Sequence, residues 1–416
     1  MLKSRKMVGK EDHKRILLCL YTFLPLSGPR SLRWLNLIKV LDQLGWTVDV
    51  LTVQPSVNDG FYDSSLLAEL PVHIRVFRTY PGVLYSLIYM KNKPVQGFPK
   101  TTMEWLPFGL MRGRKILKEQ NYSLIVSSAL PFVGHCVAYF LKRRARIPWV
   151  ADYGDSIGFN PITSPVKRLI GTRVERCILK AADGIIVPFE EMKKEFLDYY
   201  PFLKEKNIRA IGHGIPKKFE SIKPENFKNK FVVSYVGSFY KDAHEPYEFF
   251  QAFHALKSDR KTIDDIQVVI AGNVEQRYVE YARKLKIDTF TKFLGYVSYE
   301  RAISILKGSS VILYIGGRRK DYHFPFKILE CTASGKPVIA VKQSETDLGA
   351  DFIEKNNFGR IVSNNKEDIE SVIRELYRLW TMKKLDETFN HIDIEKYYWK
   401  KRGEEVEEFI SHILCK

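Results

Sequence analysis

One segment of the chain places a lysine and a carboxylate three residues apart, at Lys327 and Glu330. The apolar spacing predicts a helix over residues 326–333, and side chains three residues apart lie on the same face of a helix. A lysine there could bind a phosphate, and the carboxylate could accept hydrogen bonds from both hydroxyls of a ribose. A second interpretation stays open, because such a pair is also common on a solvated helix surface.

A glycine-containing turn near the start of the chain is another candidate for anion binding. Residues 25–30 contain Gly28 and Arg30 and lie between an expected strand and an expected helix. The free N–H groups and the positive dipole end of a helix N-terminus attract phosphate, and Arg30 could add a charge-assisted hydrogen bond. The dinucleotide-binding pattern GxGxxG is absent, so an ordinary tight turn is an equal alternative.

A similar strand and turn occur in the second half of the chain, over residues 235–244. Gly237 and Ser238 permit a ligand to approach the backbone closely, and Lys241 could reach an anion. These three residues are therefore counted as candidate binding residues.

The elements that must position these residues form two series of strands alternating with helices. In the first half, strands are expected over residues 15–20, 46–53, 73–77, 123–127, 149–151 and 184–187, and helices over 31–44, 134–144 and 165–182. In the second half, strands are expected over residues 231–236, 266–271, 291–294, 310–315 and 337–341, and helices over 245–256, 276–285, 298–306 and 326–333. The alternation predicts an α/β fold with two Rossmann-like, doubly wound domains facing across a cleft.

The expected domain boundaries follow from the point at which the alternation of strands and helices begins again. We place the first domain at residues 1–220, the second at 221–395, and a C-terminal helix that could pack back on the first domain at 396–416. The segment around Pro216 and Pro224 has few apolar residues and suits a linker. Ligands of open α/β sheets bind beyond the carboxyl ends of the strands, so the reaction is expected in the cleft.

The charge of the chain is uneven. Lysines and arginines exceed aspartates and glutamates by 18 over 416 residues, and 15 of these charges belong to residues 1–220. Such a half attracts polyanions, which include nucleic acid, anionic lipid head groups and phosphate-bearing substrates. A solubilising surface bias is the simpler alternative.

Aromatic and basic residues interleave over residues 85–118, and a second basic cluster follows at 142–146. This pattern is typical of a protein that lies on an anionic membrane surface, unless the aromatic side chains belong to the core. No apolar run reaches the roughly 18 residues of a spanning helix. Residues 16–26 fit a buried strand better than a signal peptide, because Glu11 and Asp12 stand where a basic region is expected.

The five cysteines show neither CxxC nor Cys/His spacing. Their dispersion favours a reducing compartment, with no zinc site and no disulfide framework.

Taken in order, these segments resemble the GT-B glycosyltransferases of the family 4 type, and the resemblance covers nearly the whole chain. The element Lys327…Glu330…Ser334-Gly-Lys-Pro-Val338 is similar to the family's most specific motif, KxxEYxAxGxPV, which holds the donor nucleotide. Other similar stretches are residues 105–107, 125–131, 148–155, 175–187 and 212–215.

The resemblance implies a role for each candidate in the donor-binding domain. Glu330 would hold the nucleotide ribose, and Lys241 and Lys327 would bind the diphosphate, which Gly28 and its turn would approach from the other domain. The sequence departs from the family at Tyr322, where the first glutamate of a paired motif is expected. It departs again at Ser238 or Phe239, one of which stands where the family has arginine, and at His213, where the family has asparagine.

On the acceptor side, the resemblance directs attention to polar residues near the expected strand 149–151. Asp155 is the first choice for a carboxylate that receives a hydroxyl proton, and Asp152 and His135 are lesser candidates. Each aspartate could instead cap a helix or order a loop, and a satisfied buried histidine is the favoured alternative for His135.

The resemblance implies a retaining glycosyltransferase that uses a nucleotide-sugar donor and a glycan or lipid-linked acceptor, in cell-surface polysaccharide or glycolipid synthesis. It implies no cofactor and no obligatory metal, and we expect a cytoplasmic protein at the inner face of the membrane. Three alternatives remain: a nucleotide-sugar epimerase on the same scaffold, an inactive nucleotide-binding paralogue, and a basic nucleic-acid-binding protein. No nucleic-acid-binding motif is present to favour the last of these.

Overall fold

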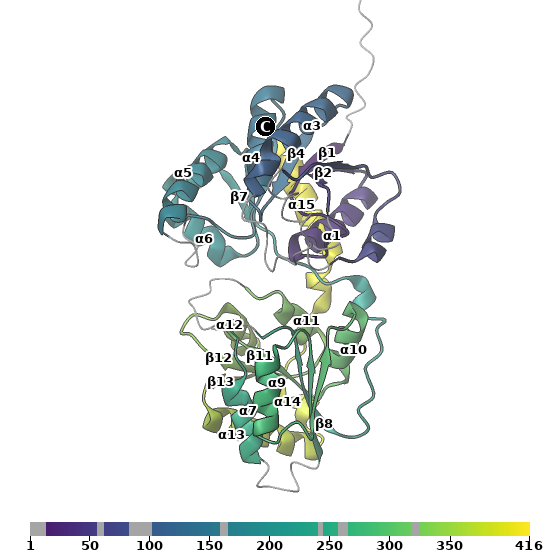
Figure 1. Cartoon of the computed structure of the whole chain (residues 1–416), viewed down its shortest axis with the longest axis vertical. Coiled ribbons are helices and arrows are strands. Elements are labelled where there is room, and N and C mark those ends of the chain that lie inside the picture. The colour runs from purple at the N-terminus through teal and green to yellow at the C-terminus, as the bar shows by residue number, and fades with distance from the viewer. Residues whose placement is uncertain are drawn as a thin grey trace, which may run out of the picture. The chain divides into compact units, whose positions relative to one another are not determined.

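The computed structural model describes residues 14–55, 62–82, 102–158, 165–239, 244–256, 265–317 and 324–416. The chain forms two compact units (Figure 1). Unit 1 combines Met1–Gly214 with Trp399–Lys416, and unit 2 is Ile215–Tyr398.

Unit 1 is built on a parallel sheet of seven strands in the order β3-β2-β1-β4-β5-β6-β7. Its strands are β1 (Arg15–Cys19), β2 (Thr47–Val53), β3 (Val76–Thr79), β4 (Leu124–Ser128), β5 (Trp149–Asp152), β6 (Gly184–Val187) and β7 (Asn207–Ala210). Its helices are α1 (Pro29–Gln43), α3 (Trp105–Glu119), α4 (Val133–Ala145), α5 (Pro165–Ala181), α6 (Glu190–Tyr199) and α15 (Trp399–Leu414), with short 3-10 helices η1 (Ser64–Glu69), η2 (Thr102–Glu104) and η3 (Pro201–Glu205).

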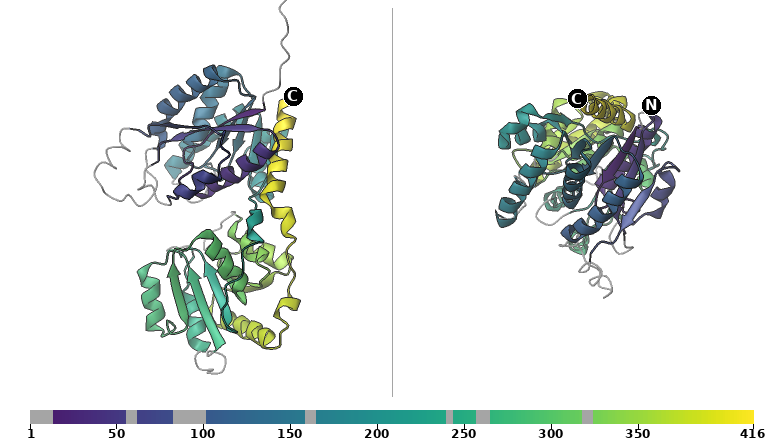
Figure 2. Two further views of the ribbon diagram at one scale, coloured as in Figure 1. Left: turned by 90° about the vertical axis from the view of Figure 1, so that its right-hand side faces the viewer. Right: turned by 90° about the horizontal axis from the view of Figure 1, so that it is seen from above.

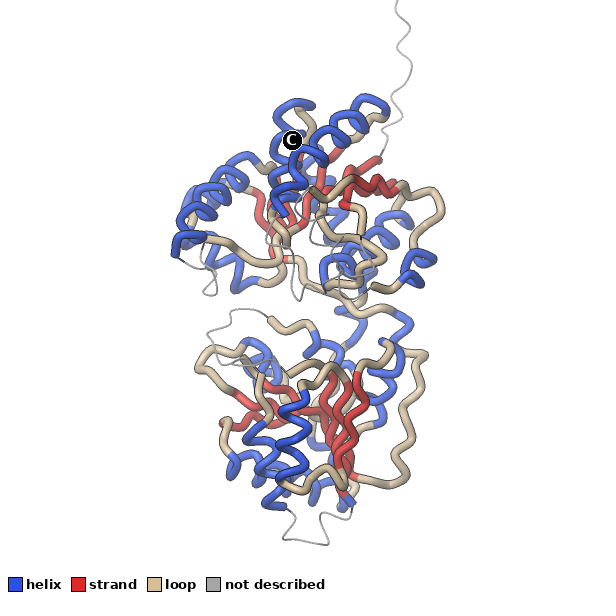
Figure 3. Tube along the Cα trace, viewed as in Figure 1, coloured by secondary structure: helices blue, strands red, loops and turns tan. Residues whose placement is uncertain are grey.

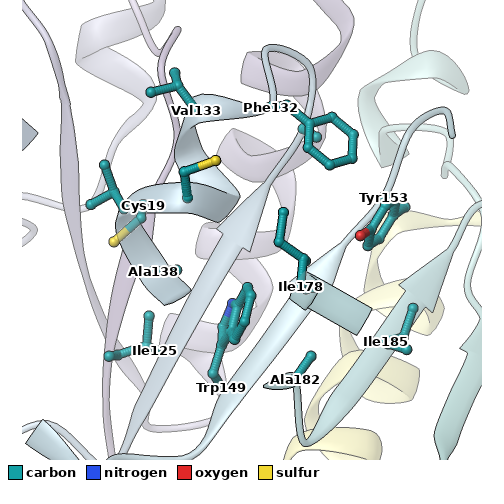
Figure 4. Close-up of a cluster of buried hydrophobic side chains, with 14 of the residues drawn as sticks. Cys19, Ile125, Phe132, Val133, Ala138, Trp149, Tyr153, Ile178, Ala182 and Ile185 are labelled. Carbon is teal, nitrogen blue, oxygen red and sulfur yellow. The ribbon is translucent and has the colours of Figure 1, made fainter. Parts of the chain in front are cut away.

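Helices cover both faces of this sheet because its strands are apolar on both sides. Neighbouring residues of β1 belong to different cores: Leu17 packs with α3, α4 and α5, whereas Leu18 packs with α1 and α15. Figure 4 shows part of the first core, where Trp149 of β5 lies among Ile125 of β4 and Ile178 of α5.

Unit 2 repeats the design with six parallel strands in the order β10-β9-β8-β11-β12-β13, flanked by helices on both faces (Figure 3). Its strands are β8 (Phe231–Val236), β9 (Ile266–Ala271), β10 (Thr291–Gly295), β11 (Val311–Ile315), β12 (Val338–Lys342) and β13 (Gly359–Ser363). Its helices are α7 (Tyr247–Leu256), α9 (Gln276–Lys284), α10 (Tyr299–Gly308), α11 (Lys327–Ala333), α12 (Leu348–Lys355), α13 (Lys366–Thr381) and α14 (Leu385–Thr388), with η4 (Lys217–Phe219) and η5 (Ile394–Tyr397). The predicted α/β fold of two doubly wound sheets is confirmed.

The last helix of the chain, α15, belongs to unit 1, where it packs against α1 (Figure 2). Gly403 permits this close approach, because a Cβ atom built on it would collide with the side chain of Val40 on α1. Gly184 of β6 likewise permits Phe409 of α15 to approach the sheet. A Cβ atom built on Gly184 would lie only 2.9 Å from the Phe409 ring.

Replacing Gly403 with valine is expected to lower the free energy of unfolding by about 1–3 kcal/mol, the usual cost of overpacking a filled core. Urea denaturation would measure the change. Lys400→Ala, at an exposed position on the same helix, is the control and should stay within about 0.5 kcal/mol of the unaltered protein. Equal stability of all three proteins would contradict the tight packing of α15 on α1.

Candidate active site

In unit 2, the carboxyl end of β8 and the first residue of α11 meet. Gly237 follows β8 with a φ of 156°, and the Lys327 Nζ lies 3.0 Å from the position that a Cβ would occupy on this glycine. A larger residue at 237 would therefore press on the ammonium group. The structure brings together a glycine backbone and a cation, an arrangement in which an ammonium group can form charge-assisted hydrogen bonds to a phosphate.

Glu330 lies one turn beyond Lys327 on α11, and the Tyr299 hydroxyl, at the start of α10, hydrogen-bonds its carboxylate. Burial raises the pKa of Glu330, and the opposing effects of Tyr299 and Lys327 are smaller. Burial and the same carboxylate raise the pKa of Tyr299. Tyr299 is not among the residues predicted from the sequence, because no local pattern links the start of one helix to the middle of another.

The other candidates near β8 are only partly described. The Ser238 carbonyl accepts a hydrogen bond of 3.1 Å from the Tyr235 hydroxyl, which fixes the backbone of the turn. Lys241 and Tyr322 lie outside the described residues, so their assignments stay predictions.

In unit 1, the Asp152 carboxylate at the end of β5 is fully buried and is held by side chains of α1 and β4. Arg33 Nε and Nη2 donate to its two oxygens at 3.3 and 3.2 Å, and Trp34 Nε1 and Ser128 Oγ each donate at 2.9 Å. Burial alone would raise the pKa of Asp152, but Arg33, Arg30 and the hydrogen bonds lower it below its ordinary value. A carboxylate with all these donors is suited to holding α1 and β4 against β5, and this geometry does not favour the proton-accepting role considered for Asp152.

Arg30 was expected to bind phosphate, but the structure turns it toward its own unit. Its Nη1 donates to Asp152 at 3.4 Å and its Nη2 to the Tyr153 carbonyl at 3.1 Å, and the side chain is only 14% exposed. Gly28 caps the N-terminus of α1, and a Cβ built on it would meet nothing within 4 Å. The turn thus leaves open space at Gly28, while the Arg30 guanidinium hydrogen-bonds the residues at the end of β5.

Asp155 lies three residues beyond Asp152, half-buried, in electrostatic contact with Arg30. His213 completes this edge of the unit: its ring packs against Trp399 with centroids 5.6 Å apart. Burial, reinforced by Arg33 and Arg30, lowers the pKa of His213 well below its ordinary value. The two predicted acceptor-side aspartates therefore lie at the end of β5 and in the loop that follows it, and a neutral histidine borders the same network.

His135, the third acceptor-side candidate, lies inside the core behind this loop. Trp149 Nε1 donates to Ser127 Oγ at 2.7 Å, and the same Oγ forms a hydrogen bond of 2.7 Å with His135 Nδ1. His135 Nε2 has no hydrogen-bond partner among the described residues, and the side chain is fully buried. Because burial lowers its pKa to about 3, His135 is a neutral core residue in this geometry, although only its Nδ1 has a hydrogen-bond partner among the described residues.

The described residues contain no group of three or more His, Cys, Asp and Glu side chains arranged to bind a metal ion. None of the described helices combines the length and apolar character of a membrane-spanning segment.

Two family models match this chain. The model described as a glycosyl transferase 4-like domain matches residues 31–214, and the model described as glycosyl transferases group 1 matches residues 217–391. The two matches therefore adjoin where the structure divides into its units. No curated protein matches the chain.

Several solved structures share the fold at low sequence identity. A glycosyltransferase from Rickettsia africae ESF-5 is 17% identical with a TM-score of 0.68, over 97% of this chain and 99% of that chain. Anabaena Alr3699/HepE, in complex with UDP and glucose, is 15% identical with a TM-score of 0.62, over 96% and 100%. The lipopolysaccharide outer core galactosyltransferase WaaB, in its apo form, is 13% identical with a TM-score of 0.61, over 96% and 99%.

The burial of His135 predicts a specific pH dependence of stability. Unfolding restores its pKa from about 3 to about 6.5, so between these values the unfolded chain binds a proton that the folded chain does not. Stability therefore falls as the pH falls through this range. From about pH 6 to about pH 4, urea denaturation should show a slope about 1.4 kcal/mol per pH unit steeper than in His135→Phe.

The exposed His412 provides the matched control, and His412→Phe should keep the slope of the unaltered protein. Equal slopes in all three proteins would mean that His135 takes up its proton in the folded state.

Proposed function

The chain belongs to the glycosyltransferases, as a protein that joins a glycosyl transferase 4-like domain to a group 1 domain, and from this premise we propose that it transfers a sugar from a nucleotide-sugar donor with retention of the anomeric configuration. Unit 2 binds the donor and unit 1 the acceptor. The acceptor is a glycan or a lipid-linked glycan, and the product belongs to a cell-surface polysaccharide or glycolipid. A lipopolysaccharide enzyme among the proteins of similar fold supports this choice of acceptor.

The proposal is carried by the position of the Lys327 ammonium against Gly237 at the end of β8. A diphosphate laid along this turn would meet the ammonium, and the ribose joined to it would face Glu330 one turn further along α11. Negative charge grows on the diphosphate as it departs, so a preorganised cation there lowers the barrier. Lys241 is proposed as a second cation, and the proposal includes no resident metal and no cofactor.

For the acceptor, we assign the proton-accepting role to Asp155. The acceptor hydroxyl must lose its proton as its oxygen bonds to the sugar and the bond to the diphosphate breaks. Among the three acceptor-side candidates, Asp152 and His135 are fully buried whereas Asp155 is half-buried. Solvent and substrate can therefore reach Asp155 most readily.

We further propose that unit 1 docks on an anionic membrane surface through the layer formed by α3, α4 and α5, which pack side by side. On α5, Leu169, Ile170 and Val174 are 59%, 61% and 38% exposed. The exposed Arg173 and Arg176 lie beside them on the same helix. Apolar side chains with a cationic border fit the interface of an anionic bilayer.

The same layer exposes further apolar side chains on its other helices. Met111 of α3 is 68% exposed and Phe140 of α4 is 43% exposed. Residues 83–101, which include half of the aromatic and basic stretch that first suggested a membrane surface, lie outside the described residues. The described part of unit 1 therefore supplies its own support for the proposal.

The donor site is tested by binding of nucleoside diphosphates. UDP is the first probe, because HepE was solved with UDP and with UDP-glucose, and GDP is the second. Lys327→Ala and Glu330→Ala are each expected to weaken calorimetric affinity for the preferred nucleotide by about 1–3 kcal/mol, the value of a lost charge-assisted hydrogen bond. Lys355→Ala, at an exposed position on α12, should leave the affinity unchanged.

Unchanged affinity in Lys327→Ala and Glu330→Ala would remove α11 from the donor site. Incubation of a labelled nucleotide sugar without acceptor distinguishes a glycosyltransferase from an epimerase, because an epimerase would interconvert the sugar under these conditions. Binding without any transfer or interconversion would favour the inactive paralogue.

Membrane docking is tested by sedimentation of the full chain with phosphatidylglycerol vesicles. Binding is expected at low salt and should weaken at high salt, because dissolved ions screen the attraction between the basic side chains and the anionic lipid head groups. The double variant Leu169→Glu/Ile170→Glu should lose most of its binding, while Met382→Glu, at an exposed apolar position of unit 2, should keep it. Absence of binding at low salt would overturn this proposal.

A further inference from the structure

Glu175 is a fully buried carboxylate on the inner side of α5. Its Oε2 accepts hydrogen bonds from Ser156 Oγ at 2.8 Å, from the Gly158 N–H at 2.9 Å and from the Tyr200 hydroxyl at 2.7 Å. Its Oε1 accepts a fourth from the Ile157 N–H at 3.1 Å. Three of these four donors belong to one stretch of loop, so the carboxylate acts as a clamp on residues 156–158.

The clamp holds the loop tightly against α5 and α6. A Cβ built on Gly158 would lie 2.7 Å from Glu175 Oε2 and would collide with the Tyr200 hydroxyl, so only glycine fits there. No described Lys or Arg forms an ion pair with Glu175. A buried carboxylate without a cation is costly in free energy, and here the hydrogen bonds that offset this cost all fix the loop or its support.

The other end of the same loop is fixed independently. Asp152, the last residue of β5, is held by Arg33, and Arg30 donates to the Tyr153 carbonyl. Asp155 therefore lies between two anchored points, one at residues 152–153 and one at residues 156–158. Its backbone position is set from both sides, although its own side chain is half-buried.

We propose that Glu175 is the positioning residue for Asp155: its hydrogen bonds to the 156–158 backbone and to Ser156 present the Asp155 carboxylate to the acceptor hydroxyl. This inference rests on the proposed function, in which Asp155 receives the acceptor proton. Glu175 does not touch the substrate and acts only through the loop. Displacements of about 1 Å at a reacting group can cost about a hundredfold in rate, so a clamp of this kind has a large effect on turnover.

Glu175→Gln tests the inference, because an amide NH2 would face either the Ile157 N–H or the three donors at Oε2 and could not accept from them. We expect kcat to fall about 10- to 100-fold, with the calorimetric affinity for the nucleoside diphosphate unchanged. Amide hydrogen exchange of residues 155–158 should become faster. Tyr200→Phe, which removes one donor but leaves the loop bonds in place, should retain most of the kcat.

Asp49→Asn is the matched control, because Asp49 is an equally buried carboxylate of unit 1 that is bound by Arg75 and Tyr122, remote in sequence from the loop. It should lower stability without selectively lowering kcat. An equal fall of kcat in Asp49→Asn, or faster loop exchange in Glu175→Gln with kcat unchanged, would overturn the inference. Asp155→Asn distinguishes a failure of the proposed function from a failure of the positioning role of Glu175. If Asp155→Asn retains full activity, the proposed role of Asp155 fails, whatever effect Glu175 has on the loop.

Discussion

The buried contact between Arg33 and Asp152 is the constraint on which unit 1 depends. The guanidinium binds both carboxylate oxygens and also donates to the carbonyls of Ile211 and Gly212 at 3.0 and 2.7 Å. One side chain thus joins α1, the end of β5 and the segment through which the chain leaves unit 1. Removing Asp152 would leave the Arg33 guanidinium buried without an ion pair, and removing Arg33 would leave Asp152 only the longer contact to Arg30 among the described cations, so either change is expected to loosen these elements.

The two units use their charged residues differently. In unit 1, Arg30 and Arg33 hydrogen-bond Asp152 and backbone carbonyls. Their positive charge therefore stabilises the structure around the end of β5. In unit 2, the exposed Lys327 lies over the turn at Gly237. The same α/β design therefore commits two arginines to internal contacts in one unit and leaves a lysine exposed in the other, which matches an acceptor side and a diphosphate side in the proposed reaction.

The sequence predicted what depends on local pattern. Apolar strand runs gave both sheets, and the spacing of Lys327 and Glu330 placed them on one helix, which the structure shows as α11. Contacts between distant segments cannot be predicted from local pattern: the turn at Gly28 suggests a phosphate ligand for Arg30, and nothing near it in sequence indicates its hydrogen bond to Asp152, which lies 122 residues away. The burial of His135 and the clamp of Glu175 likewise depend on how helices pack on the sheet. The strands β7 and β13 were missed, because each is short and only partly buried.

Unit 1 is assembled from two stretches of chain that are separated by the whole of unit 2. During synthesis, the face of the sheet that carries α1 must wait for α15, while unit 2 is continuous and complete as soon as Tyr398 has emerged. At roughly 5–20 residues per second, translation of the intervening segment takes on the order of ten seconds or more. Apolar side chains such as Val40 stay uncovered on the ribosome for that time, so unit 2 can finish folding before the unit that precedes it, and chaperones have a defined interval in which to bind the nascent chain.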